Sequence, residues 1–191
     1  MKELSLHLLD IAENSIAAGA KNIRIYVGED SRSDLLQMSV SDDGRGMSKE
    51  MAEQATDPFI TTRTTRKVGL GIPLLKLAAE ACNGYLAIDS QPGKGTNLVV
   101  QFQRNHIDRM PMGDLVSTIL HLVIANPQIH WRFEYRFNDR SAVFDDAVIK
   151  QELGDIPLTE PTILAFLKEM IHTMIMEINP QFQQHTYTIQ N

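Results

Sequence analysis

The helix predicted over residues 2–18 is the feature that most constrains the fold of this chain. Its apolar residues recur at helical spacing, so one stripe of the helix can anchor it in a core. Asp10 and Asn14 are one turn apart, and their side chains share a face roughly opposite that stripe. For the helix alone, a solvated polar face is the ordinary alternative to a ligand site. The stripe consists of Leu4, Leu8, Ile11 and Ser15, widened by Leu9, Ala12 and Ile16.

Strand-like and helix-like runs alternate after this helix and predict an α/β protein. The first group comprises strands at 22–27 and 35–40, helices at 48–54 and 72–82, and strands at 85–90 and 96–102. The second comprises a helix at 114–125, strands at 129–137 and 141–145, and helices at 146–153 and 160–178. A polar connection after Gln103 separates the two groups. We therefore predict two domains, residues 1–103 and a small α+β domain of residues 104–191.

Composition excludes several classes of protein. With 43% hydrophobic and 22% charged residues the chain is in the globular range, and its net charge of −6 argues against general binding to nucleic acid or anionic membranes. Cys82 is the only cysteine, so an internal disulfide is excluded. The start lacks a signal-peptide pattern, and no run of about 18 apolar residues occurs. We expect a soluble, cytoplasmic protein.

The segment SDDGRG at 41–46 follows the second predicted strand. Asp42 at the strand exit can accept a hydrogen bond from an exocyclic amine such as that of adenine. Gly44 and Gly46 allow the backbone to approach a flat ligand closely. Taken alone, a D-x-G-x-G pattern is more often an ordinary turn.

Basic residues and glycines gather in TTRTTRKVGLGIPLLK at 61–76. Three cations and two glycines precede a predicted helix N-terminus, where backbone N–H groups and the helix dipole attract phosphate. The segment has no apolar period, so we expect a loop, and it fits neither a Walker A nor a Rossmann pattern. The plain alternative is a solvated basic loop. The cations are Arg63, Arg66 and Lys67, and the glycines are Gly69 and Gly71.

The order and spacing of these motifs over residues 4–103 resemble the GHKL ATPase superfamily. The motifs are D-x-x-x-N, D-x-G-x-G, a Pro-Phe loop, G-x-G and a closing G-x-G-T. ENSIAAGA resembles the mismatch-repair branch, whereas DPFITTR and GLGIPLLK resemble the histidine kinases. The resemblance implies the Bergerat fold, a two-layer α/β sandwich with helices on one face of a mixed sheet, and ATP bound between helix and lid.

The resemblance also implies roles for individual residues. Asn14 would hold Mg²⁺, Asp42 would recognise adenine, and Thr96 would support Asp42 through water. Asp10 is the catalytic candidate, because a carboxylate there could orient and deprotonate a water aimed at the terminal phosphate. The other predicted nucleotide contacts are Gly44 and Gly46 at the base, and Arg63, Arg66, Lys67, Gly69, Leu70 and Gly71 at the phosphates.

Two departures from the superfamily pattern affect these predictions. The hydrolysing branches have Glu where this chain has Asp10, which is one methylene shorter and weakens the case for water activation. Superfamily domains usually have a strand before the first helix, and only nine residues precede Asp10 here. The sheet edge left open would be filled by the second domain or by another copy of the chain in a homodimer.

Two functions are open at this point. A histidine kinase carries its phosphoacceptor on a dimerising helical hairpin, for which this chain has no room, and His7 lacks a phosphoacceptor context. We favour a stand-alone kinase or regulatory ATPase that acts on a partner protein, like the anti-sigma serine kinases or a detached sensor-kinase domain. The alternative is a nucleotide-gated switch or ATP sensor without phosphotransfer.

Residues 104–191 contain no catalytic constellation. Trp131, Phe133 and Tyr135 alternate with charged residues, which predicts a strand with one face beneath a helix. The last helix has an apolar stripe that predicts core packing, with a partner-binding surface as the alternative. That stripe consists of Ile163, Phe166, Leu167, Met170, Ile171, Met174 and Ile178.

Overall fold

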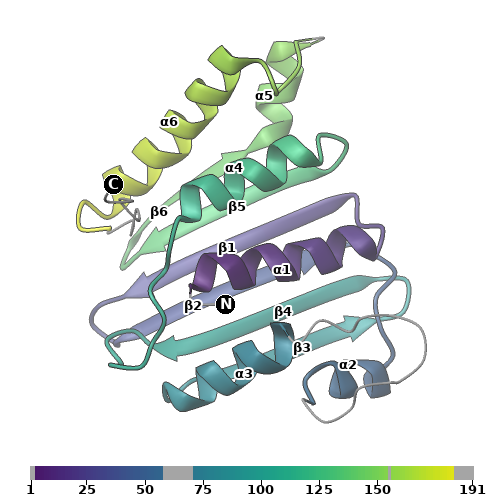
Figure 1. Ribbon diagram of the computed structural model, residues 1–191, viewed down its shortest axis with the longest axis vertical. Helices are drawn as coiled ribbons and strands as arrows, with labels where there is room; N and C mark the ends of the chain where they lie inside the picture. Colours follow the sequence, from purple (N-terminus) through teal and green to yellow (C-terminus); the bar gives the residue numbers. More distant parts are fainter. Residues whose placement is uncertain (1–2, 58–70, 155, 183–191) are drawn as a thin grey trace, which may run out of the picture.

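One mixed six-stranded sheet with helices on one face forms the fold (Figure 1). The computed structural model describes residues 3–57, 71–154 and 156–182. The strands are β1 (Asn22–Asp30), β2 (Leu35–Asp42), β3 (Tyr85–Gln91), β4 (Gly95–Gln103), β5 (His130–Phe137) and β6 (Arg140–Asp145). Their order is β3-β4-β2-β1-β5-β6, and neighbouring strands are antiparallel except β1 and β5, which are parallel. This is the two-layer α/β sandwich predicted from the sequence.

The helices lie side by side over the sheet, α3 next to α1, α1 next to α4, and α4 next to α6. They are α1 (Leu4–Ala17), α2 (Lys49–Ala55), α3 (Gly71–Ala81), α4 (Leu115–Ala125), α5 (Asp146–Leu153) and α6 (Pro161–Ile178). At the start of α2 and of α4, a side chain caps the helix. The Ser48 hydroxyl accepts from the Met51 N–H at 3.3 Å, and the Asp114 carboxylate accepts from the Ser117 N–H at 2.9 Å.

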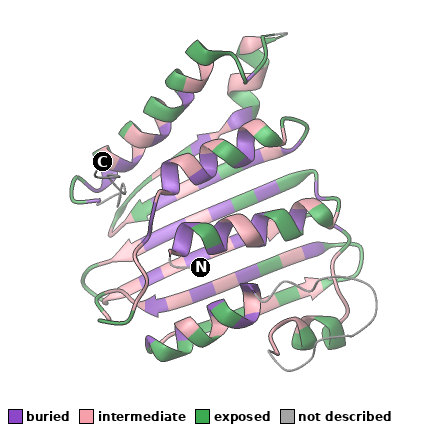
Figure 2. Ribbon diagram, in the orientation of Figure 1, coloured by how far each residue is buried: buried purple, intermediate pink, exposed green. Residues whose placement is uncertain are grey.

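Alternate residues of the strands build the core beneath the helices. Each such side chain contributes about 1.5–3 kcal/mol when it is fully buried. The intervening residues face away from the helices and are more exposed (Figure 2). The alternation predicted for β5 is confirmed, since Trp131, Phe133 and Tyr135 are at most 2% exposed. The other strands contribute Ile23, Ile25, Val27, Leu36, Met38, Val40, Leu98, Val100 and Phe102.

The C-terminal strands continue the same sheet. β5 pairs in parallel with β1, from Asn22 opposite His130 to Glu29 opposite Phe137, and β6 pairs with β5. We predicted that an open sheet edge would be filled by the second domain or by another copy of the chain; in the structure, β5 of this chain lies beside β1. One hydrophobic core extends beneath both parts. The division into domains at residues 103 and 104 stays a prediction.

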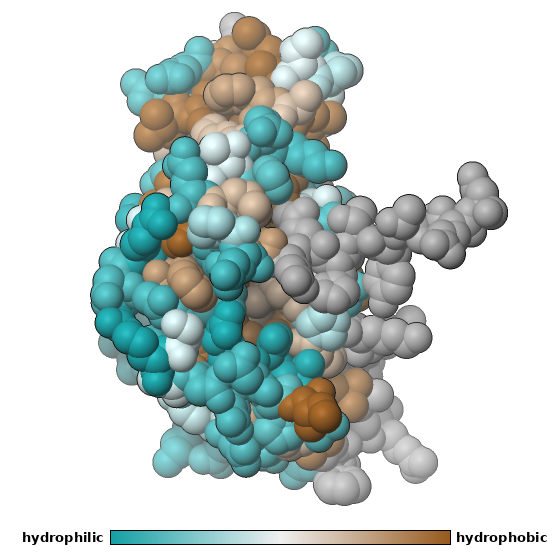
Figure 3. All heavy atoms as spheres, turned by 90° about the vertical axis from the view of Figure 1, so that its left-hand side faces the viewer, coloured by the Kyte–Doolittle hydropathy of each residue, from teal (hydrophilic) through white to brown (hydrophobic). Residues whose placement is uncertain are grey.

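The stripe predicted for α6 is wrong at one position. Phe166 is 59% exposed, whereas Ile175, outside the predicted stripe, is fully buried with Leu167 and Ile171. Hydrophobic atoms gather at the end of the molecule formed by α5 and α6, seen at the top of Figure 3. Val148 and Ile156 are also more than half exposed there.

Some predictions lie outside the described residues. The loop expected before α3 falls largely on residues 58–70. Among the described residues, no helix combines the length and apolarity needed to cross a bilayer.

Candidate functional site

Asp42 is held at the exit of β2 by two hydrogen bonds. Its Oδ2 accepts from the Ser15 hydroxyl of α1 at 2.6 Å, and its Oδ1 accepts from the Gly44 N–H at 2.8 Å. A carboxylate has about four acceptor positions, so these two bonds leave acceptor capacity on the partly exposed Asp42. The group is therefore oriented and can still accept from a ligand.

Glycines allow the segment after Asp42 to pass close to its neighbours. A Cβ on Gly44 would lie 2.9 Å from the side chain of Ala18, at the end of α1. Gly46 has a φ of +65°, and a Cβ there would overlap the carbonyl of Gln91. A Cβ on Gly95, with a φ of +95°, would overlap the carbonyl of Asp42 itself. The α1 end, the SDDGRG turn and the β3–β4 turn thus meet backbone against backbone.

Thr96 is opposite Asp42 in the pairing of β2 with β4, so both side chains lie on the helix-covered face. The Thr96 hydroxyl lies 2.9 Å from the hydroxyl of Ser90, which in turn accepts from the Met47 N–H at 2.8 Å. These contacts tie β3 and β4 to the glycine segment. The support of Asp42 by Thr96 through water stays a prediction.

Asp10 and Gly71 bring α1 against the N-terminal end of α3. A Cβ on Gly71 would overlap the Asp10 carboxylate, so with any other residue there this side chain would have to move. Backbone N–H groups at a helix start attract negative charge. His7, one turn before Asp10, is 3% exposed, and its Nδ1 has no hydrogen-bond partner among the described residues. Burial lowers the pKa of His7, which favours the neutral ring.

Asn14 lies on α1 between Asp10, which is close to Gly71, and Ser15, which bonds to Asp42. Its side chain is exposed. Its amide makes no hydrogen bond to the described part of the chain, so its oxygen is free for a ligand. The structure thus places Asp10 with Gly71 on one side of Asn14, and Asp42, Gly44, Gly46 and Thr96 on the other. The remaining predicted contacts, Arg63, Arg66, Lys67, Gly69 and Leu70, lie outside the described residues.

Another group carries metal-binding side chains, His130, Asp145 and Asp146. Its atoms already have partners, because Lys150 Nζ lies 2.5 Å from Asp146 Oδ2 and the His130 ring contacts Asp145 at 2.8 Å. Asp146 Oδ1 also accepts from the Trp131 N–H at 2.9 Å. Since Lys150 supplies a competing positive charge, we interpret the group as a structural link between β5, β6 and α5.

Comparison with known families decides what the first part of the chain is. The family described as "Histidine kinase-, DNA gyrase B-, and HSP90-like ATPase" matches residues 2–106. This chain belongs to that family. It therefore carries a GHKL-type ATP-binding domain, as its motifs predict.

Relatives of this GHKL chain include two larger proteins. The "Non-motile and phage-resistance protein" of Caulobacter vibrioides is 32% identical over 119 residues, which cover 58% of this chain and 14% of that protein. The "Cell-division control histidine kinase PdhS" of Brucella ovis is 36% identical over 115 residues, covering 53% of this chain and 11% of that protein. The chain therefore spans only a small part of either relative.

A solved structure described as the "N terminal domain of a DNA repair protein" has the same fold. The TM-score is 0.53 with 14% sequence identity, over 75% of this chain and 52% of that chain. At this identity the similarity extends to the fold alone.

Sequence reasoning missed two residues that contact the candidate site. Ser15 was recognised only as part of the apolar stripe of the first helix, yet its hydroxyl orients Asp42. A hydroxyl that continues a buried stripe must find a hydrogen-bond partner, and this was the available signal. Ser90 gave no comparable signal, because it lies at an ordinary strand end.

Proposed function

We propose that the chain binds ATP between α1 and the N-terminal end of α3 and transfers its terminal phosphate to a partner protein. The oriented Asp42 carboxylate carries this proposal. Its unused acceptor capacity suits the exocyclic amine of adenine, and the glycines beside it bring the end of α1 and the β3–β4 turn close to this carboxylate. A GTP guanine presents a carbonyl oxygen at the corresponding position, which the carboxylate would repel.

Asn14 is the proposed ligand for Mg²⁺. Its exposed, neutral amide oxygen is a hard donor of the type that this ion uses together with phosphates and water. When bound, the ion would neutralise charge on the phosphates.

Asp10 is the proposed general base. In transfer, a hydroxyl or imidazole of the partner attacks the terminal phosphorus, the bond to the β-phosphate oxygen breaks, and ADP leaves. Asp10 would accept the proton released by the attacking group. Asp10, on α1, lies next to Gly71 at the start of α3. This supports the role, because a helix N-terminus also attracts the phosphates.

A nucleotide-gated switch is the second candidate, and one observation favours it. The first N–H groups of α1 donate to the segment that leads into the C-terminal part, Leu4 to Pro111 at 3.0 Å and Ser5 to Met112 at 2.8 Å. A shift of α1 on ATP binding would therefore move that segment.

Terminal-phosphate-labelled ATP, incubated with the protein and a cell lysate, distinguishes the candidates. A labelled partner band that disappears with Asp10→Asn supports the kinase, since a lost general base costs about 10²–10⁴ in rate. Phosphate release without a labelled band supports a hydrolysing switch. If neither a labelled band nor phosphate release is seen, but ATP changes the conformation of the protein, the result supports a sensor.

The binding site itself is tested by thermal unfolding. Saturating Mg·ATP at 100 times its Kd should stabilise the protein by about 2.7 kcal/mol. Asn14→Ala should remove most of this effect, and Asp42→Asn should abolish the preference for ATP over GTP. An undiminished rise in melting temperature with Asn14→Ala, or equal affinity of the parent protein for ATP and GTP, would contradict the proposed site.

A further inference from the structure

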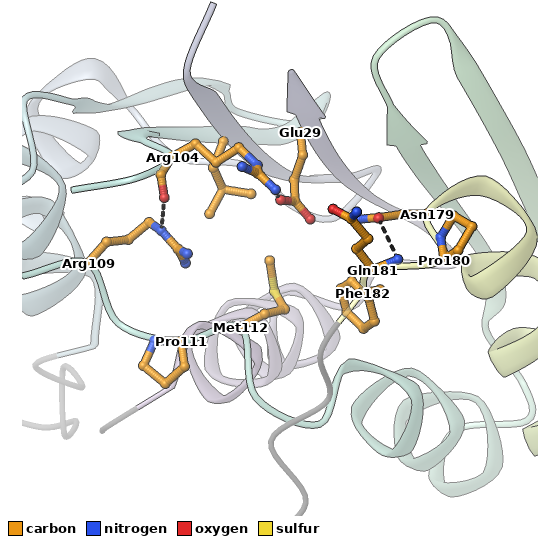
Figure 4. Close-up of a pocket in the computed structure, with 10 residues that line it drawn as sticks. Glu29, Arg104, Arg109, Pro111, Met112, Asn179, Pro180, Gln181 and Phe182 are labelled. Carbon is orange, nitrogen blue, oxygen red and sulfur yellow. Dashed lines mark hydrogen bonds and ion pairs between the residues drawn. The ribbon is translucent and has the colours of Figure 1, made fainter. Parts of the chain in front are cut away.

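A cavity lies at the opposite end of the central strands from Asp42 (Figure 4). Its volume is about 800 Å³, and its lining comes from the end of β1, the start of β2, the segment between β4 and α4, and the residues after α6. From Leu36 to Asp42, β2 spans about 20 Å at about 3.3 Å per residue. The cavity is therefore separate from the proposed nucleotide site.

Arg109 brings a positive charge to this cavity. Its Nε donates to the Arg104 carbonyl at 2.6 Å and its Nη1 to the Met110 carbonyl at 2.8 Å. These carbonyls fix the guanidinium without neutralising it, and Figure 4 shows the side chain directed into the open space. Among the described residues, Arg109 forms no ion pair. Burial lowers the pKa of Arg109, which reports the cost of holding this charge away from water.

The carboxylate of the cavity, Glu29, is already engaged. Its Oε2 accepts from Arg104 Nε at 2.7 Å, and its Oε1 accepts from the Tyr135 hydroxyl at 2.8 Å. The Tyr135 hydroxyl accepts in turn from Asn179 Nδ2 at 3.0 Å. Among the described residues, this network leaves Arg109 without a carboxylate in ion-pair contact. A half-buried charge of this kind is stabilised by an anion.

Apolar side chains line the cavity beside these charges. Leu36, Met112 and Phe182 are at most 8% exposed, and Pro111 adds a further apolar surface. The cavity thus combines fixed polar and charged groups with apolar side chains, and its volume is in the range of small-molecule sites. We infer that this cavity binds an organic anion, whose acidic group pairs with Arg109 and whose apolar body lies against Met112 and Phe182.

A matched pair of dyes tests the inference. The probe is 8-anilino-1-naphthalenesulfonate, and the control is N-phenyl-1-naphthylamine, which has the same aromatic body without the charge. In fluorescence titrations, the sulfonate should bind at one site at least about tenfold more tightly than the amine, because hydrogen bonds to charged groups are the stronger ones.

Two variants locate the probe. Arg109→Met should weaken sulfonate binding about tenfold and leave amine binding unchanged. Gln181→Glu adds a negative charge to the cavity lining and should also weaken sulfonate binding. The Gln181 side chain is exposed, and the hydrogen bond of this residue to Asn179 Oδ1, at 3.2 Å, comes from its backbone N–H. Gln181→Glu should therefore fold, and it tests the charge of the cavity even if Arg109→Met does not fold. Arg132→Met, on the open face of the sheet, is the matched control and should change nothing.

Competition with nucleotide completes the test. Saturating Mg·ATP should leave the sulfonate bound, since the two sites are about 20 Å apart. The inference would be overturned by displacement with Mg·ATP, by equal binding of the two dyes, or by unchanged sulfonate affinity in both Arg109→Met and Gln181→Glu. The outcomes with the two dyes and the two variants do not depend on whether the protein is a kinase or a switch.

Discussion

The two ends of the central strands hold their polar groups in different ways. Around Asp42, glycines and short hydroxyl side chains bring backbone against backbone. At the other end, Glu29, Arg104 and Tyr135 hold one another through long side chains. The first end thus depends on the absence of Cβ atoms, whereas the second depends on charge. Each end should therefore fail under a different kind of substitution.

The largest expected effect is at a glycine of the Asp42 end. Gly95→Ala should destabilise the protein by about 3 kcal/mol or more, because a positive φ and overlap with the Asp42 carbonyl act together. Gly93 has a φ of +76° but open space around it, so Gly93→Ala should cost about 1 kcal/mol. Urea unfolding measures both. Equal costs would show that close approach is not what distinguishes this end.

A charge substitution should affect the opposite end. Glu29→Gln should destabilise by about 1–2 kcal/mol, since it replaces a charge-assisted hydrogen bond to Arg104 by a neutral one. Glu53→Gln, on the exposed surface of α2, should change stability by less than about 0.5 kcal/mol. Combining Glu29→Gln with Tyr135→Phe in a double-mutant cycle tests the network. Strict additivity would argue against it.

A smaller effect is expected at the hydroxyl that orients Asp42. Ser15→Ala should destabilise by about 1 kcal/mol and weaken ATP binding several-fold, because Asp42 loses a hydrogen bond that fixes its orientation. Ser39→Ala, on the face of β2 away from the helices, is the control for both measurements. If calorimetry gave the same ATP affinity for Ser15→Ala and the parent, Ser15 would have only a structural role.

The smallest effect should be the pH dependence of stability that His7 causes, one turn before Asp10 on α1. Burial lowers the folded-state pKa of His7 below its ordinary value of 6.5, so the unfolded chain binds more protons. Stability from this group is present above pH 6.5 and is lost as the pH falls below it. His7→Leu should flatten the profile between about pH 7 and 5, where carboxylates contribute little. An unchanged slope in denaturant titrations would rule out His7 as the cause.

Local signals predicted the elements and part of the candidate site. Ser48 and Asp114 cap helices because their side chains act on N–H groups a few residues away. Asp42 and its glycines were predicted as site residues in the same way, since strand exit and turn are contiguous. The Ser15 contact was missed because it joins residues 27 positions apart.

Non-local packing accounts for the other differences. Alternation predicted which face of β5 is buried, but it contains no information on which strand lies beside it. In α6, Phe166 and Leu167 are adjacent and both apolar, so spacing alone did not decide which of them packs on the sheet. The cavity was not predicted, because its walls come from four segments of the chain.

The parallel pairing of β1 with β5 has a consequence for how the chain is made. β1 leaves the ribosome about a hundred residues before its partner, and until then one edge of the growing sheet has unpaired N–H and C=O groups. Pairing β1 with β5 requires a contact between residues far apart in the sequence, which is slow to form. During synthesis the nascent chain should therefore depend on chaperones most strongly before β5 emerges.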